Sequence, residues 1–161
     1  MSLERRHEGR THHRQESHTK LYMTIYVFRG APDFHYKRHV LIYFQSPANE
    51  FYETVHVVRD DKKSPWRVDR VHHKVDWAMT VLYLFHCDGG ALWVPSGQEL
   101  APANIMASVS TENKEEDKGW NCQHFLLEGL KQLVDAGYQT QEWYNWVENA
   151  LMNLLLDGAC D

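Results

Sequence analysis

One cysteine stands where a protein backbone can activate a thiol. Cys122 follows Asn121, whose side-chain oxygen can accept a hydrogen bond from a first-turn N–H and so begin a helix. At the first helical position, free backbone N–H groups and the helix dipole favour a thiolate over a thiol. A thiolate of this kind can attack a carbonyl carbon, so Cys122 is a candidate nucleophile. We therefore expect its pKa to lie below the reference value of about 8.5.

The segment after Cys122 has the pattern of a helix with one buried face. Leu126, Leu130, Leu133 and Val134 recur at helical spacing, and Gly137 is placed to end the helix. The same pattern allows a structural interpretation of Cys122, as a small residue that starts a buried helix. The cysteine alone does not separate the two.

Two histidines are predicted to lie side by side on a sheet. His39 to Gln45 and Phe51 to Arg59 are rich in branched and aromatic residues, and Ser46-Pro47-Ala48-Asn49 suits a four-residue hairpin loop. If Gln45 pairs with Glu50, paired numbers add to 95 and His39 lies directly opposite His56. Opposed residues share a face, with Cβ atoms about 5 Å apart. A cysteine enzyme needs an imidazole to exchange protons and a polar group to orient it, and His39 and His56 are candidates for these roles.

These segments resemble the motifs of a known superfamily. Asn121-Cys122-Gln123-His124-Phe125 resembles the Asn-Cys-Glu-His-Phe motif of the lecithin:retinol acyltransferase group, which belongs to the NlpC-type papain-like superfamily. His39-Val40-Leu41-Ile42-Tyr43 resembles that group's His-Trp-Ala strand, and Val55-His56-Val57 resembles the segment of its second histidine. The resemblance implies a permuted papain-like fold, in which the histidine strand precedes the cysteine helix along the chain.

The chain is also similar to a group of small uncharacterised fungal proteins. These share a Leu-Tyr start, a His-Trp-Ala-Leu strand, a Tyr-His-Ala strand and an Asn-Cys-x-x-Trp-Val helix, and some lie in secondary-metabolite gene clusters. Val40 and Phe125-Leu126 depart from this pattern without removing a catalytic group. The membrane-engaging insertion of the acyltransferases is not evident, which argues against lipid substrates. The resemblance implies Cys122 as nucleophile, His39 as general acid and base, and His56 as the residue that orients His39.

Composition narrows the classes of function. The formal net charge of −5 argues against a general nucleic-acid binder. Cys87, Cys122 and Cys160 form no paired framework, which fits a reducing compartment, and no apolar run is long enough to span a membrane. We expect a cytoplasmic protein that uses a small-molecule or acyl substrate and no cofactor. The spacing of His86-Cys87 and of Cys122 with His124 matches no closed metal site, so no metal is expected.

The remaining sequence predicts one α+β domain. Residues 1–20 have little apolar content and are expected to be a disordered tail, and residues 21–157 are expected to form the domain. Further strands are expected at 21–29, 66–75 and 79–87, the last of them central and ended by Asp88-Gly89-Gly90, and further helices at 96–109 and 141–155. The predicted fold is thus an antiparallel sheet of about five strands packed against the Cys122 helix.

Two functions remain open on this evidence. The first is a cysteine-dependent hydrolase or acyl transferase acting on an amide, ester or thioester. The second is a scaffold that binds a hydrophobic metabolite, or cyclises one, without using Cys122 as a nucleophile. The oligomeric state is not predicted.

Overall fold

A five-stranded antiparallel sheet is the frame of the molecule in the computed structural model, which describes residues 17–114 and 119–160. The strands are β1 (His18–Phe28), β2 (His39–Ser46), β3 (Phe51–Val58), β4 (Arg67–Val71) and β5 (Tyr83–Pro95), in the order β4-β3-β2-β1-β5. The described residues form three α-helices, α2 (Ala101–Ala107), α3 (Cys122–Asp135) and α4 (Gln141–Leu156). The α+β class with an antiparallel sheet of five strands and a Cys122 helix is therefore confirmed.

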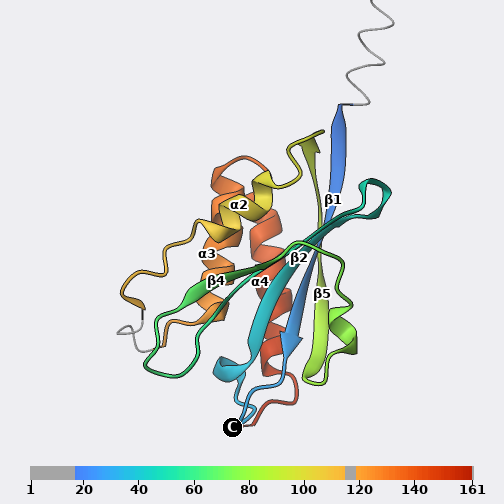
Figure 1. The fold of residues 1–161 in the computed structure, drawn as a ribbon. Coiled ribbons are helices and arrows are strands. Elements are labelled where there is room, and N and C mark those ends of the chain that lie inside the picture. The colour runs from blue at the N-terminus through green and yellow to red at the C-terminus, as the bar shows by residue number, and fades with distance from the viewer. Residues whose placement is uncertain (1–16, 115–118, 161) are drawn as a thin grey trace, which may run out of the picture.

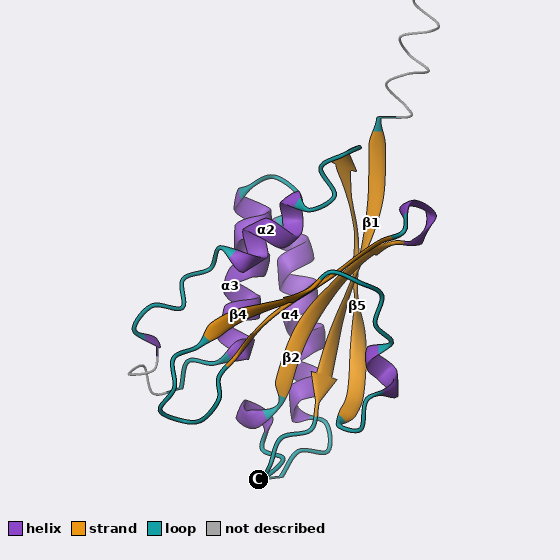
Figure 2. Cartoon of the chain, in the orientation of Figure 1, coloured by secondary structure: helices purple, strands orange, loops and turns teal. Residues whose placement is uncertain are grey.

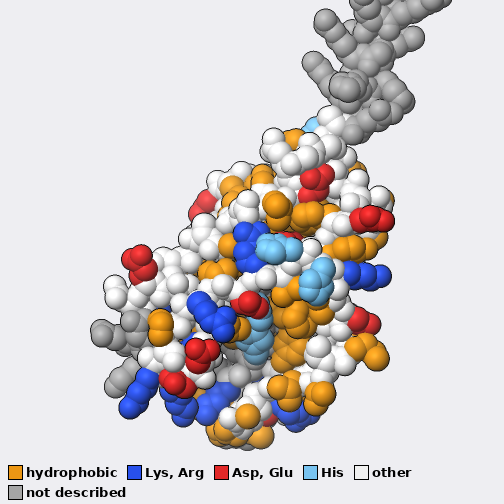
Figure 3. Space-filling model, in the orientation of Figure 1, with side chains coloured by type: hydrophobic (Ala, Val, Ile, Leu, Met, Phe, Trp, Pro, Cys, Tyr) orange, Lys and Arg blue, Asp and Glu red, His pale blue; other side chains and the backbone are white. Residues whose placement is uncertain are grey.

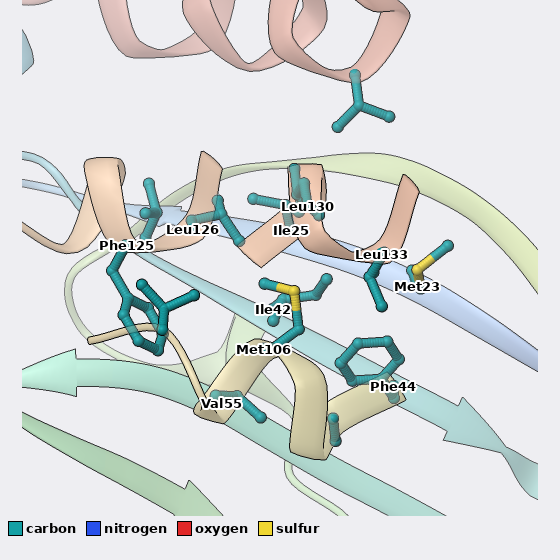
Figure 4. Close-up of a cluster of buried hydrophobic side chains, with 14 of the residues drawn as sticks. Met23, Ile25, Ile42, Phe44, Val55, Met106, Phe125, Leu126, Leu130 and Leu133 are labelled. Carbon is teal, nitrogen blue, oxygen red and sulfur yellow. The ribbon is translucent and has the colours of Figure 1, made fainter. Parts of the chain in front are cut away.

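The helices cover one face of the sheet. Figure 1 shows α3 and α4 behind strands β2 and β4, and Figure 2 shows the purple helices gathered on that side of the orange strands. The core between the layers joins alternate residues of the strands to the apolar faces of the helices; those labelled in Figure 4 are Met23, Ile25, Ile42, Phe44, Val55, Met106, Phe125, Leu126, Leu130 and Leu133. We call this side of the sheet the inner face.

The opposite side, the outer face, carries a smaller apolar cluster. Phe28, Leu41 and Tyr43 are buried there, and Trp77 is among the aromatic residues packed against them. Because strand residues alternate between faces, Val40 and Ile42 pack inward while Leu41 and Tyr43 pack outward. The outer face is thus a second packed surface rather than a plain solvated one.

The hairpin of β2 and β3 differs in register from the prediction. Ile42 pairs with Val55 and Ser46 with Phe51, so paired numbers add to 97 and not to 95. Ser46 stays in the strand, and Glu50 closes the loop in a left-handed conformation with φ 51°. A change of two in the sum keeps every residue on its predicted face. His39 and His56 therefore share a face as diagonal neighbours, and the prediction that they are directly opposed is wrong.

The domain begins earlier than predicted. Strand β1 starts at His18, and residues 18–20 pair with Trp93 to Pro95 of β5. Thr19 is buried and its hydroxyl donates to Glu99 Oε1 over 3.1 Å. The predicted tail boundary at residue 20 is thus too late, and residues 1–16 lie outside the described residues.

Strand β5 lies at an edge of the sheet and not at its centre. It begins at Tyr83, later than predicted. The apolar side chains of Met79, Val81 and Leu82, which precede the strand, are exposed. It also continues through Gly89 and Gly90, where the register with β1 shifts between Tyr22 and Thr24. Gly89 lies so close to β1 that an added Cβ would be 3.1 Å from Met23 Cβ. These glycines serve a bulge within the strand, which is why they do not end it.

Candidate functional site

The start of α3 is joined to the segment that leads into His39. The Asn121 side chain caps the helix by accepting from Gln123 N over 2.9 Å, and its Nδ2 donates to Tyr36 O over 2.8 Å. Gln123 Nε2 donates to His35 O and to Arg38 O. Side chains from both neighbours of Cys122 thus hold the helix start against residues 35–38. Gln123 was not identified from the sequence, where it had no signal beyond its place beside Cys122.

Cys122 lies beside the backbone of the histidine strand. The residue is 6% exposed, and its Sγ donates to Arg38 O over 3.9 Å. Burial raises the pKa of the thiol to about 11, against the opposing effect of the backbone N–H groups of Val40, Cys122 and Gln123. The helix-start N–H groups act in the predicted direction, but desolvation outweighs them. The predicted lowering of the Cys122 pKa is therefore wrong for the resting molecule.

His39 is linked to two further groups across the outer face. Its Nε2 lies 2.7 Å from His56 Nδ1, and His56 Nε2 lies 2.7 Å from Asp69 Oδ2. Asp69 is directly opposite His56 on the neighbouring strand β4. The sequence places Asp69 in a predicted strand, but the β3–β4 register that pairs it with His56 could not be derived. The structure therefore extends the two predicted histidines to a line of three residues, Asp69, His56 and His39.

This line determines which nitrogens carry protons. A carboxylate only accepts, so His56 Nε2 donates to Asp69 and leaves His56 Nδ1 as an acceptor. His39 Nε2 then donates to His56 Nδ1, which leaves His39 Nδ1 with a lone pair. Burial lowers the pKa of His39 to about 4, with a further contribution from His56, and burial also lowers the pKa of His56. Both rings are thus neutral near pH 7, and His39 Nδ1 is a base.

His39 lies between two hollows on the surface. The first, which we call the Cys122 hollow, has a volume of about 290 Å³, and its lining includes Tyr36, Lys37, Arg59, Lys62 and Trp66 with His39 and Cys122. The second, the apolar hollow, has a volume of about 430 Å³ and is lined by His39 and His56 with Phe28, Leu41, Trp77 and Leu82 among others. Figure 3 shows pale blue histidine and orange apolar side chains together over this face. His39 thus adjoins both a polar and an apolar surface.

The Cys122 thiol and the His39 imidazole belong to different faces of the sheet. Cys122 packs with the inner core, whereas His39 shares the outer face with Leu41, and its ring lies 5.9 Å from the Phe28 ring at a tilt of 40°. In the described residues the thiol donates to Arg38 O, and no hydrogen bond joins it to the His39 ring. The ladder between β2 and β3 ends at Ile42 and Val55, so His39 lies beyond the paired part of the hairpin. The two side chains line one hollow there, while the hydrogen bond that the thiol donates goes to the backbone.

Other polar residues near the site have structural explanations. His124 Nδ1 accepts from Asn121 N over 3.2 Å and completes a capping box at the start of α3. Within residues 17–114 and 119–160, no three His, Cys, Asp or Glu side chains are arranged to hold a metal ion. None of the helices in these same residues combines the length and the apolar character needed to cross a bilayer.

Comparison of the chain with protein-family models, with curated proteins and with solved structures finds no match.

Proposed function

We propose that the protein is a cysteine-dependent hydrolase or acyl transferase that acts on an amide, ester or thioester. One observation carries the proposal: the hydrogen-bonded line from Asp69 through His56 ends at His39, which lines the hollow of Cys122 at the start of a capped helix. Cys122 is the nucleophile, His39 the general base and acid, and His56 orients His39. The order of these residues along the chain supports a permuted papain-like domain.

The reaction begins from a neutral thiol and a neutral imidazole. As Sγ attacks the substrate carbonyl carbon, the thiol proton passes to His39 Nδ1, and the carbonyl oxygen becomes an oxyanion near the backbone N–H groups at the start of α3. The oxyanion then collapses, and His39 gives its proton to the leaving amine, alcohol or thiol. Water, or an acceptor, releases the acyl group from Cys122 with His39 again acting as base. The raised pKa of Cys122 implies that proton transfer accompanies attack and does not precede it.

Trapping of the acyl enzyme tests this proposal. The protein is incubated with N-acetylcysteamine thioesters and p-nitrophenyl esters of graded acyl length, and peptides are analysed by mass spectrometry. We expect the acyl mass on the peptide that holds Cys122, its loss in Cys122→Ser, and its retention in Cys160→Ser, because Cys160 is an exposed thiol outside the hollow. Failure of every substrate to acylate Cys122, with turnover unchanged in Cys122→Ser, would overturn the proposal.

A second candidate function is favoured by the apolar hollow. Its walls are Phe28, Leu41 and Trp77, and both imidazoles line it, so a bound hydrophobic metabolite would meet His39 as a base. Such a site suits binding or cyclisation of the metabolite without a covalent intermediate. A Cys122→Ser variant that keeps turnover, beside a His39→Gln variant that loses it, would select this function over the first.

The free thiols Cys87, Cys122 and Cys160 support placing either activity in the cytoplasm, where cysteines stay reduced.

A further inference from the structure

We propose that the Cys122 hollow binds an anionic group of the substrate, a phosphate or a carboxylate, through Lys37, Arg59 and Lys62. The inference rests on the proposed function, since it names the class of substrate for the same site. The substrate would then carry its negative charge in the same hollow that Cys122 and His39 line.

The hollow is positively charged in an acidic protein. Lys37, Arg59 and Lys62 line it, and no Asp or Glu is among its lining residues, although the chain has a formal net charge of −5. Ion pairs among the described residues use other cations, such as Arg67 with Asp60 and Arg70 with Glu53. The three cations of the hollow are thus available to a bound anion.

A fourth cation in the lining has a structural role. Arg38 is 2% exposed; its Nε and Nη2 donate to the Asp33 carboxylate, and its Nη1 donates to the carbonyls of Leu154 and Asp157. With these acceptors in place, Arg38 is satisfied within the fold. We therefore exclude it from the proposed site.

Arg59 is held in a position suited to anion binding. Its guanidinium carbon lies 4.2 Å from the centre of the Trp66 ring, and Nη1 donates to Lys62 O over 3.3 Å. A guanidinium fixed in this way loses little freedom on binding, and its planar fork matches the oxygens of a phosphate or carboxylate. The nearby acid Asp61 does not line the hollow, and its Oδ1 accepts from the backbone N–H groups of Lys63 and Ser64.

The positive electrostatic potential at Cys122 Sγ can be measured with two alkylating agents of different charge. Iodoacetate is an anion, and iodoacetamide is its neutral counterpart. We expect the rate ratio of iodoacetate to iodoacetamide to be about threefold higher at Cys122 than at the exposed Cys160, and to fall as salt is added, because exposed charges are screened within about 10 Å. Arg59→Gln and Lys62→Gln should lower the ratio towards that of Cys160.

Lys63→Gln is the matched control, because it removes the same charge next to Lys62 from a residue that does not line the hollow. If Cys122 is too buried to react with either reagent, a second measurement tests the site without alkylation. Inorganic phosphate and acetate are titrated separately at constant ionic strength, and the Trp66 indole N–H signal is followed by NMR. A larger shift with phosphate identifies a phosphate site, and a larger shift with acetate identifies a carboxylate site. Arg59→Gln should remove either shift.

The inference is overturned if neither anion moves the Trp66 signal, or if Arg59→Gln and Lys63→Gln have equal effects on the rate ratio. Acylation of Cys122 without any anion preference would refute this site and leave the proposed function intact. Anion binding without acylation would refute the proposed function and leave the site intact.

Discussion

Asp69 controls the proton on His39 through one intervening imidazole. Its carboxylate, at 2.7 Å from His56 Nε2, accepts a hydrogen bond from this nitrogen, which leaves His56 Nδ1 as an acceptor for His39. An amide in place of this carboxylate can donate, and the donation would reverse both rings and put a proton on His39 Nδ1. The base would then be lost although every side chain keeps its place.

We therefore predict that Asp69→Asn lowers the rate of Cys122 acylation by about 100-fold or more, the size of a general-base contribution. Nitrogen-15 NMR of the two imidazoles should show the change of tautomer, which a merely structural role would not produce. Asp60→Asn, an exposed carboxylate paired with Arg67, is the control and should change neither quantity. Unchanged tautomers in Asp69→Asn would contradict the prediction.

Burial of the neutral histidines makes stability depend on acid. The pKa of His39 is about 4 in the folded state and 6.5 for an ordinary histidine, so the unfolded chain takes up this proton first as pH falls. The contribution is complete above pH 6.5 and is lost progressively between pH 6.5 and 4. We expect the free energy of unfolding to fall by roughly 3 kcal/mol across this window from His39. His39→Gln should flatten the urea-unfolding profile against pH, and exposed His73→Gln should not.

At the scale of single elements, the start of α3 does two things. The Asn121 side chain caps the helix and also donates to Tyr36 O, next to the strand that carries His39. Loss of an N-cap costs about 1 kcal/mol, and loss of the second bond adds to it. Asn121 therefore contributes both to the stability of the helix and to the position of Cys122.

We predict that Asn121→Ala lowers stability by about 1–2 kcal/mol and speeds alkylation of Cys122 by iodoacetamide, because the thiol becomes less enclosed. Thr140→Ala is the matched control: Thr140 caps α4 by accepting from Trp143 N over 3.1 Å. It should cost similar stability in urea unfolding without changing the alkylation rate. Equal alkylation rates in the two variants would show that Asn121 does not position the sulfur.

How far the sequence predicts the structure depends on the range of the interaction. Periodicity and caps are local, so Asn121 as an N-cap and the helix from Cys122 follow directly from the residues. The face shared by His39 and His56 also follows, since only parity matters and an error of two in the register preserves it. Asp69 and the raised pKa of Cys122 do not follow, because the first needs a strand pairing and the second needs the packed surroundings of the sulfur.

At the scale of the whole molecule, the start of β1 at His18 predicts different melting temperatures for two N-terminal deletions. Removing residues 1–16 takes away a segment of low apolar content, so we expect little change in melting temperature. Removing residues 1–20 also takes away three pairs of β1 with β5 and the bond from Thr19 to Glu99. Calorimetry should show a further fall of about 3 °C or more, on the order of 1 kcal/mol for a domain of this size. Equal melting temperatures would show that the pairs of residues 18–20 with β5 contribute nothing to stability.

Arg38 couples the two ends of the described chain at the residue just before His39. Its buried guanidinium donates to the carbonyl of Leu154, 116 positions later, and Cys160 N donates to Asp33 O, the residue whose carboxylate pairs with Arg38. During synthesis Asp33 and the His39 strand emerge from the ribosome before α4, whereas the carbonyl acceptors of Arg38 emerge only with the end of α4. A nascent chain that stops short of Asp157 lacks the carbonyls that accept from Arg38 Nη1, so its guanidinium is paired with the Asp33 carboxylate alone. We therefore expect the segment just before His39 to reach its final packing only after α4 is made, long after its own synthesis.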